Sequence, residues 1–131
     1  MKINDKYSHL VEEARKTKLN AYAPYSRYQV GAALLTRNGE IYTGVNVENS
    51  SFGLTVCAER IAIFNALSQG NQDLEAIAIS AQGEEIPYPC GACRQVMNEF
   101  NPDLMVILDS GDHINIYSLQ ELFPMAFKLK R

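Results

Sequence analysis

Three cysteines and one neighbouring carboxylate are the residues of this chain whose types and spacing are best suited to chemistry. Cys90 and Cys93 stand three residues apart in the segment PCGAC, and Cys57 precedes Glu59 by two residues in another segment. Thiolates are soft ligands that suit zinc, so the three thiols are candidate metal ligands. Structural zinc sites are closed by four protein ligands, whereas three ligands leave a position for water. The cysteine count therefore favours a catalytic zinc site over a structural one.

Other interpretations of the cysteines stay open at this point. Free cysteine is among the most buried residue types, and an inert core thiol would be the preferred interpretation of Cys57 taken alone. A Cys-x-x-Cys pair also occurs in thioredoxin-like redox sites, but that interpretation leaves Cys57 and Glu59 without a role. The two histidines, His9 and His113, lie far in sequence from the cysteines. We expect both on the surface rather than in a closed metal site.

Two predicted helices would position these groups. Residues 56–69 are apolar almost all round, which indicates a helix buried on several sides, in part by another subunit, and residues 91–100 form a second helical segment. Cys57 and Glu59 then lie in the first turn of one helix, and Cys90 opens the other. Side chains of a first turn tilt toward the helix N-terminus, so these groups can reach a shared point beyond the two helix starts. The positive end of each helix favours thiolates there.

The remaining elements predict the fold class. Residues 30–36 and 41–47 are apolar runs on either side of Asn38-Gly39, the strongest two-residue hairpin signal, and predict two antiparallel strands. The same periodicities predict strands over 75–81, 104–108 and 114–117, a helix over 5–20, and a short helix capped by Ser118 and Glu121. Intervening helices imply parallel crossovers, and therefore a three-layer α/β/α sandwich around a five-stranded mixed sheet. Loops 48–55 and 82–89 would leave the ligand-binding edge of that sheet.

Composition places the chain among globular proteins. Its 131 residues are 47% hydrophobic and 21% charged, which fits one domain over residues 1–131. Twelve Lys and Arg against fifteen Asp and Glu give a net charge of −3, so the bulk positive charge that supports nucleic-acid binding is absent. The chain has no apolar run of about 18 residues and no secretory h-region at its start. We therefore expect a cytoplasmic protein with no membrane partner and reduced thiols.

The two cysteine segments resemble the paired signature of the zinc-dependent cytidine deaminases. Cys57-Ala58-Glu59-Arg60 and Pro89-Cys90-Gly91-Ala92-Cys93-Arg94-Gln95 match the small homotetrameric branch of that family, which carries three cysteines. The resemblance extends from about residue 22 to residue 127 through four further motifs: Ala23-Pro24-Tyr25-Ser26, Val30-Gly31-Ala32-Ala33, Gly44-Val45-Asn46-Val47-Glu48-Asn49 and Leu122-Phe123-Pro124-Met125-Ala126-Phe127.

The resemblance implies a cytidine deaminase-like catalytic domain with one Zn²⁺ per subunit. Cys57, Cys90 and Cys93 match the zinc ligands, and Glu59 matches the proton shuttle. Zinc lowers the pKa of its water toward about 7 for attack on C4 of cytosine, and a nearby carboxylate can move the proton to N3 and then to the leaving amine. Arg60 is expected to offset the negative charge of three thiolates by hydrogen bonds to sulfur.

The resemblance also implies the contacts to the substrate. Asn46 and Glu48 match residues that hold the ribose hydroxyls, although they could instead be polar groups of a turn, and period-two alternation puts both on one face. The backbone N–H and C=O of Ala58 would read the pyrimidine edge. Phe127, and with it Phe52, match aromatic residues that neighbouring subunits lend to the site.

Two positions depart from the family pattern. Tyr28 stands where the family commonly has Phe against the base, and its extra hydroxyl needs a partner if it is buried. Tyr88 stands before Pro89, where the family often has Ser or Thr. Both departures bear on fine substrate preference more than on the type of reaction.

The function implied is hydrolytic deamination of cytidine and 2′-deoxycytidine to uridine and 2′-deoxyuridine, with release of ammonia, in pyrimidine salvage. The expected partner is a small pyrimidine nucleoside, and the expected assembly is a homotetramer with shared active sites. One alternative is a deaminase of an aminoacyl-nucleoside antibiotic. A polynucleotide deaminase would need a basic channel that an acidic chain does not favour. A non-catalytic zinc-stapled binding module would have no need of Glu59.

Overall fold

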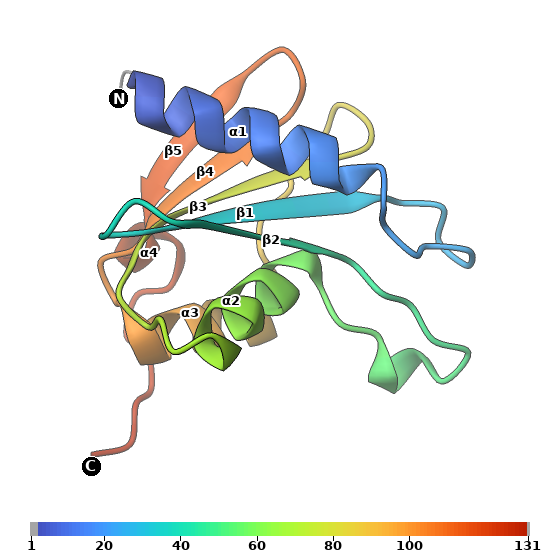
Figure 1. Cartoon of the computed structure of the whole chain (residues 1–131). Helices are drawn as coiled ribbons and strands as arrows, with labels where there is room; N and C mark the ends of the chain where they lie inside the picture. Colours follow the sequence, from blue (N-terminus) through green and yellow to red (C-terminus); the bar gives the residue numbers. More distant parts are fainter. Residues whose placement is uncertain (1–2, 131) are drawn as a thin grey trace.

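A five-stranded mixed sheet lies between one helix on one face and two helices on the other (Figure 1). The computed structural model describes residues 3–130. The strand order is β2-β1-β3-β4-β5, and the predicted three-layer α/β/α sandwich is confirmed. The elements are α1 (Asp5–Lys18), β1 (Val30–Thr36), β2 (Ile41–Val45), the 3₁₀ turn η1 (Phe52–Leu54), α2 (Ala58–Ser68), β3 (Leu74–Ala81), α3 (Gly91–Phe100), β4 (Met105–Asp109), β5 (Ile114–Ser118) and α4 (Leu119–Leu122).

Strands β1 and β2 form the predicted antiparallel hairpin. Gly39 in the connecting turn has φ +90°, a conformation that glycine adopts without steric cost. The second strand was expected over 41–47 but ends at Val45. Beyond that point the chain forms isolated bridges with Tyr22 and Val56 instead of continuing the ladder. The residues that follow β2 therefore leave the sheet and are held between two loops.

The crossovers place two helix starts at the same edge of the sheet. Strands β3 and β4 are parallel and are joined by α3, as predicted. Strand β1 is antiparallel to both β2 and β3, so β2 and β3 run in the same direction and α2 connects them across β1. The carboxyl ends of β2 and β3 thus meet at one edge, from which the chain enters α2 and α3. At the other end, α4 has the predicted capping box between Ser118 and Glu121.

Helix α1 is fastened to its face of the sheet by apolar packing and by a buried ion pair. Its buried stripe consists of Leu10, Val11 and Ala14. Two nitrogens of Arg15 lie 2.8 Å from the two carboxylate oxygens of Asp109 at the end of β4, and the Ser80 hydroxyl donates to the same carboxylate at 2.9 Å. Asp109 is only 2% exposed. This polar cluster fixes α1 without contributing to the face that carries the cysteines.

Helix α2 packs unusually close to the sheet on the opposite face. Gly44 of β2 makes this possible, because a Cβ atom at that position would lie 2.4 Å from Ala62 N and 2.5 Å from Ala58 O. The helix begins two residues later than the expected start at residue 56, since Cys57 is its N-cap. Small residues at this contact therefore determine the distance between α2 and the sheet.

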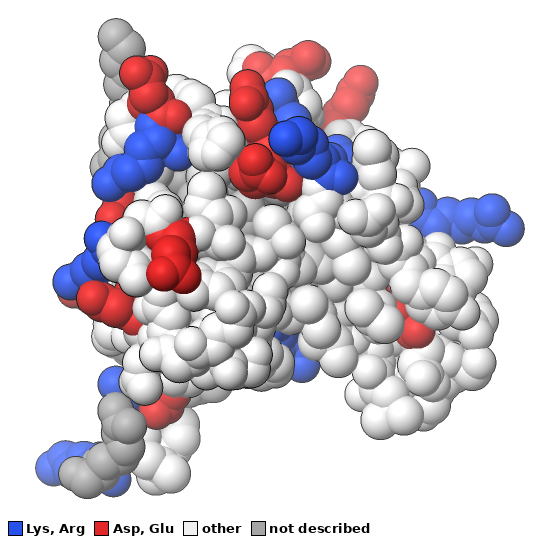
Figure 2. All heavy atoms as spheres, viewed as in Figure 1, with Lys and Arg blue, Asp and Glu red and all other residues white. Residues whose placement is uncertain are grey.

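The outer side of α2 is only partly covered by the residues that the structure describes. Phe64 is 46% exposed, and Figure 2 shows few charged side chains on the surface over α2 and over η1. The expected burial of this helix on several sides is therefore only partly met by one chain. Within residues 3–130, no helix combines the length and the apolar composition that crossing a bilayer requires.

Candidate active site

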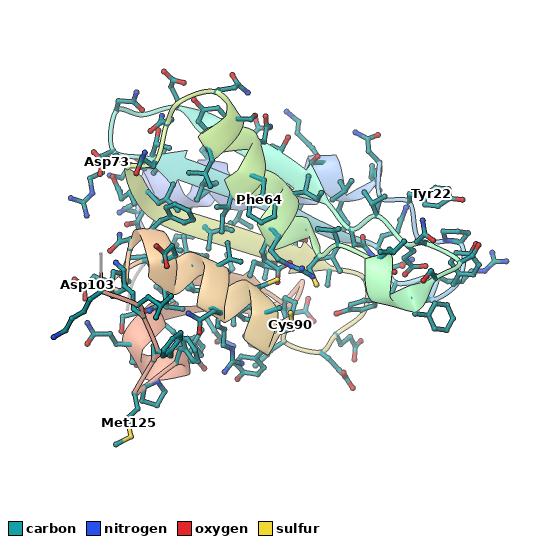
Figure 3. The ribbon with its side chains drawn as sticks, turned by 90° about the horizontal axis from the view of Figure 1, so that it is seen from below. Tyr22, Phe64, Asp73, Cys90, Asp103 and Met125 are labelled. Carbon is teal, nitrogen blue, oxygen red and sulfur yellow. The ribbon has the colours of Figure 1, made fainter. Side chains whose placement is uncertain are left out.

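The starts of α2 and α3 bring the three cysteines together. Cys57 is the N-cap of α2, Cys90 is the N-cap of α3, and Cys93 lies in the first turn of α3. The Sγ atoms of Cys57 and Cys90 are 3.7 Å apart, and those of Cys90 and Cys93 are 3.5 Å apart. Figure 3 shows Cys90 where the two helix starts face each other. The convergence expected from the two segments is present.

The geometry of the three thiols fits a zinc ion with one open position. All three sulfurs lie within 4.8 Å of one another, and among residues 3–130 this group of possible metal ligands contains the cysteines alone. A tetrahedral zinc with Zn–S distances of about 2.3 Å separates its sulfur ligands by about 3.8 Å. Both histidines are exposed, as expected, and neither joins the cluster. Three protein ligands leave the fourth position free for a water molecule or a substrate.

The thiols differ in how readily they ionise. The pKa of Cys57 is lowered to about 5, first by a hydrogen bond from the Cys93 thiol and also by Arg60. The same hydrogen bond raises the pKa of Cys93, because its proton is held against the sulfur of Cys57. Arg60 Nη2 lies 3.6 Å from Cys57 Sγ, and Arg60 Nε is buried with no partner among the described residues. A divalent cation is the natural means of stabilising thiolates that lie this close together.

Glu59 is the buried carboxyl group beside this cluster. It is the second residue of α2 and is 5% exposed. Burial, together with the negative charge on Cys57, raises the pKa of Glu59 to about 7. A carboxyl group with a pKa close to neutrality can both take up and release a proton during one reaction cycle.

A cavity of about 230 Å³ opens beside Cys57, Cys90 and Glu59. Of the predicted substrate contacts, four line it: Tyr28, Asn46, Glu48 and Ala58. Three larger hollows, of about 430, 380 and 490 Å³, open on the described part of the surface, and none of them is lined by a cysteine. Chemistry rather than size therefore identifies the site.

Asn46 and Glu48 have structural partners as well as positions on the cavity wall. Asn46 is 8% exposed, and its amide donates to Tyr28 O at 2.8 Å and accepts from the N–H of Val30 at 2.9 Å. Glu48 accepts from the N–H of Tyr25 at 3.0 Å. The two interpretations of these residues, as sugar ligands and as polar groups of a turn, are therefore compatible. Each side chain holds the loop that precedes β1 and still borders the cavity.

The structure does not bring Phe127 to the cavity of its own chain. The Phe127 side chain is 65% exposed, and its carbonyl oxygen accepts a hydrogen bond of 2.8 Å from Gln95 Nε2 on α3. Phe52 is 75% exposed and borders an adjoining hollow of about 380 Å³, which shares Ser26, Glu48 and Thr55 with the cavity. Its ring lies edge-on to Tyr25 at 6.1 Å. Both aromatic side chains are available to a second chain.

The two tyrosines that depart from the family pattern both line the cavity and are partly exposed. Tyr28 is 41% exposed and Tyr88 is 49% exposed. The Tyr88 ring lies 6.2 Å from the ring of Tyr117. Because neither residue is buried, the structure does not require a buried hydrogen-bond partner for either phenol.

Ser26 and Arg94 received no role from the sequence, although both stand inside the recognised motifs. Arg94 Nε donates to Pro89 O at 2.8 Å and Nη1 donates to Leu122 O at 2.6 Å, so the guanidinium ties the turn before the second cysteine segment to the end of α4. The Ser26 hydroxyl donates to the Glu48 carboxylate. The signal available in the sequence was a polar side chain inside a specific motif. The sequence did not indicate the partners, because Glu48 lies 22 residues from Ser26 and Leu122 lies 28 residues from Arg94.

Comparison with known proteins assigns the family. Residues 4–109, which contain both cysteine segments, match the model of the cytidine and deoxycytidylate deaminase zinc-binding region. The chain belongs to the cytidine and deoxycytidylate deaminase family. This membership confirms the resemblance found in the sequence and the assignment as an enzyme. Together with the cysteine cluster it confirms zinc as the cofactor.

Similar deaminases match nearly the whole chain. A cytidine deaminase of Halalkalibacterium halodurans is 50% identical over 121 residues, which cover 90% of this chain and 91% of the relative. The crystal structure of a cytidine deaminase from Burkholderia pseudomallei superposes with a TM-score of 0.89 at 44% identity, covering 92% of this chain and 98% of that one. A blasticidin-S deaminase of Bacillus cereus is 31% identical over 126 residues, covering 90% and 89%. An antibiotic-nucleoside deaminase is thus a more distant relative of this deaminase.

Proposed function

We propose that this deaminase hydrolyses cytidine and 2′-deoxycytidine to uridine and 2′-deoxyuridine with release of ammonia, as one catalytic domain over residues 1–131. The observation that carries the proposal is one cavity that combines three converging thiols and a buried carboxyl, Glu59, with the polar pair Asn46 and Glu48. The thiols and the carboxyl group suit zinc-assisted hydrolysis, and the polar pair suits hydrogen bonds to sugar hydroxyls. The names of the similar proteins support the same substrate class.

Glu59 is the group that moves protons in this mechanism. When bound to the three thiolates, Zn²⁺ lowers the pKa of a water molecule toward about 7 and so supplies a nucleophile for C4 of the base. Glu59 would take one proton from that water and give it to ring N3, and would then take the remaining proton of the new C4 hydroxyl and give it to the amino group, which leaves as ammonia when the C4–N bond breaks. Its burial between the start of α2 and the cavity keeps bulk water from competing for the proton.

Arg60 and the helix starts balance the charge of the metal ligands. Three thiolates on Zn²⁺ give a formal charge of −1, which weakens the ion as a Lewis acid. The Arg60 guanidinium, 3.6 Å from Cys57 Sγ, withdraws electron density from that sulfur. The N-terminal ends of α2 and α3 act in the same direction.

The cavity wall positions the nucleoside. Ala58 is the first residue of α2, so its N–H has no partner within the helix and is free to donate to the pyrimidine edge. Glu48 and Asn46 receive the sugar hydroxyls, and Tyr28 packs beside the base. Contacts remote from C4 hold the base in place for reaction, and this binding energy lowers the barrier.

The assembly proposed is a homotetramer in which Phe127 of one chain closes the active site of another. The exposed aromatic residues Phe52, Phe64 and Phe127 and the nearly uncharged surface over α2 and η1 support it (Figure 2). Two inactive variants, one lacking Glu59 and one lacking Phe127, should partly restore activity when refolded together. Light scattering that showed an active monomer would refute the arrangement. If only the mixing experiment failed, the tetramer would still stand, but Phe127 would not be the residue that the subunits share.

The reaction converts a cytosine nucleoside into a uracil nucleoside, which fits pyrimidine salvage in the cytoplasm. Purified protein with cytidine, followed by ultraviolet absorbance with and without a strong chelator, tests the function. We expect loss of cytidine, one ammonia per uridine, and inhibition by the chelator that added Zn²⁺ reverses. Blasticidin S is the comparison substrate. Turnover of blasticidin S without turnover of cytidine would overturn the proposal in favour of the antibiotic deaminase, and turnover of neither would favour the binding module.

A further inference from the structure

The carboxylate of Glu48 is held at both oxygen atoms by one turn of the chain. Its Oε1 accepts the N–H groups of Tyr25 at 3.0 Å and of Ser26 at 3.1 Å, and its Oε2 accepts the hydroxyl of Ser26. A carboxylate offers about four acceptor positions, two on each oxygen. Three are occupied within the chain. The position that remains is on Oε2, so Glu48 can receive a single further donor.

The direction of the Ser26 hydroxyl is fixed by a second hydrogen bond. Ser26 Oγ accepts the N–H of Tyr28 at 3.0 Å, so its own proton is directed to Glu48. The turn is closed by the N–H of Arg27 to Ala23 O at 3.0 Å, with Arg27 in the left-handed region at φ +59°. A non-glycine residue in that region is uncommon and persists where neighbouring contacts hold it.

The hydroxyl of Ser26 also connects residues that line the cavity. Tyr28 is held at its N–H by Ser26 and at its C=O by the Asn46 amide, at 2.8 Å. Ser26, Tyr28, Asn46 and Glu48 all line the cavity. Loss of the Ser26 hydroxyl would therefore free Oε2 of Glu48, whereas Oε1 would keep its two backbone N–H donors and Tyr28 would keep its hydrogen bond from Asn46.

We infer that Ser26 is a positioning residue for sugar recognition, which orients Glu48 so that the free acceptor position of Oε2 receives one hydroxyl of the substrate. The inference rests on the proposed function, because it takes Glu48 as a sugar contact. Hydrogen bonds from Ser26 also keep the pKa of Glu48 below its usual value, so the carboxylate is an acceptor at neutral pH. An ionised acceptor favours a neutral hydroxyl donor over a phosphate at this position.

The test compares Ser26→Ala with Ser26→Thr, which keeps the hydroxyl, on cytidine and on 3′-deoxycytidine. We expect Ser26→Ala to lower kcat/KM for cytidine about tenfold, mainly through KM, as for loss of a hydrogen bond to a charged group. The Ser26→Thr variant should retain most of the activity. Because 2′-deoxycytidine is also a proposed substrate, the hydroxyl that we assign to Glu48 is the 3′-hydroxyl, which cytidine and 2′-deoxycytidine both carry. On 3′-deoxycytidine, which lacks it, Ser26→Ala should have little effect. In a Glu48→Ala background it should likewise add little.

Several results would overturn the inference. Equal losses of kcat/KM on both nucleosides, or a loss of the same size in the Glu48→Ala background, would show that Ser26 does not act through Glu48. Ser26 is exposed, so its truncation leaves no cavity, and a large drop in the urea midpoint of Ser26→Ala would assign it a structural role. Failure of the proposed function is a separate outcome, because the wild-type protein would then deaminate neither nucleoside.

Discussion

Replacement of Gly44 by alanine should damage the metal site from a position outside it. The new Cβ would lie 2.4 Å from Ala62 N and 2.5 Å from Ala58 O, whereas ordinary contacts are 3.4 Å or longer. Both neighbours are backbone atoms of α2, so the helix must move by about 1 Å to relieve the overlap. The start of that helix carries Cys57 and Glu59.

Gly31→Ala provides a matched control on the other face of the sheet. A Cβ there would lie 2.3 Å from Ala14 O and 2.6 Å from Lys18 N, so the overlap is as severe but displaces α1. Helix α1 carries none of the proposed site residues. Both variants should lose about 1–3 kcal/mol of unfolding free energy, the usual cost of overpacking.

Only Gly44→Ala should also lose catalytic activity, because only this substitution displaces the start of α2. A misplacement of about 1 Å can lower a rate about 100-fold, so we expect kcat on cytidine to fall by about that factor, with weaker zinc retention in a chelator competition. Gly31→Ala should keep its zinc and most of its kcat. Urea unfolding, zinc content and kcat are measured on the same preparations. Equal losses of kcat in the two variants would refute the reasoning that the position of α2, and not that of α1, determines the geometry of the site.

Three further variants test separate parts of the structure. Cys90→Ala should retain much less than one zinc per chain, and full zinc occupancy by metal analysis would remove Cys90 from the ligand set. Asn46→Ala should lower kcat/KM for cytidine and also the unfolding free energy, by about 1–2 kcal/mol, because the backbone of residues 28–30 loses two hydrogen bonds; unchanged stability would contradict the second role. Arg15→Ala should cost about 2 kcal/mol at pH 7 in urea unfolding, because it leaves the buried Asp109 carboxylate without its cation, while kcat is unchanged. Burial alone would raise the pKa of Asp109, but hydrogen bonds from Arg15 and other donors keep it below its ordinary 3.8, so the contribution is present above that pH and should vanish as the pH falls further.

Local signals predicted most of the elements. The Asn38-Gly39 pair located the β1–β2 turn, the spacing of Ser118 and Glu121 predicted the capping box of α4, and the segment 91–100 coincides with α3. Each of these features depends on residues within one element or one turn. For the same reason the convergence of the cysteines could be anticipated, since two crossovers in one direction bring two helix starts to one edge.

Features that depend on contacts between distant segments could not be predicted from periodicity. The second strand was expected to continue to residue 47, but the ladder ends at Val45. The backbone of Val47 instead forms isolated bridges with Tyr22 and Val56. The engagement of Glu48 by the turn at Ser26 likewise joins segments 22 residues apart. Neither contact leaves a pattern in its own segment, because the pairing is decided by the packing of two loops.

The most direct test of the proposed mechanism is to measure zinc content and cytidine turnover together in Glu59→Gln. The substitution keeps the size of the side chain and the three thiols but removes the group that carries the proton. We expect full zinc occupancy, an unchanged urea midpoint or a slightly higher one, since a neutral amide avoids the cost of a buried charge, and a loss of kcat of about 10² to 10⁴-fold. Near-normal turnover in a zinc-loaded Glu59→Gln protein would contradict the role of Glu59. Loss of zinc together with activity would instead place Glu59 among the groups that hold the metal.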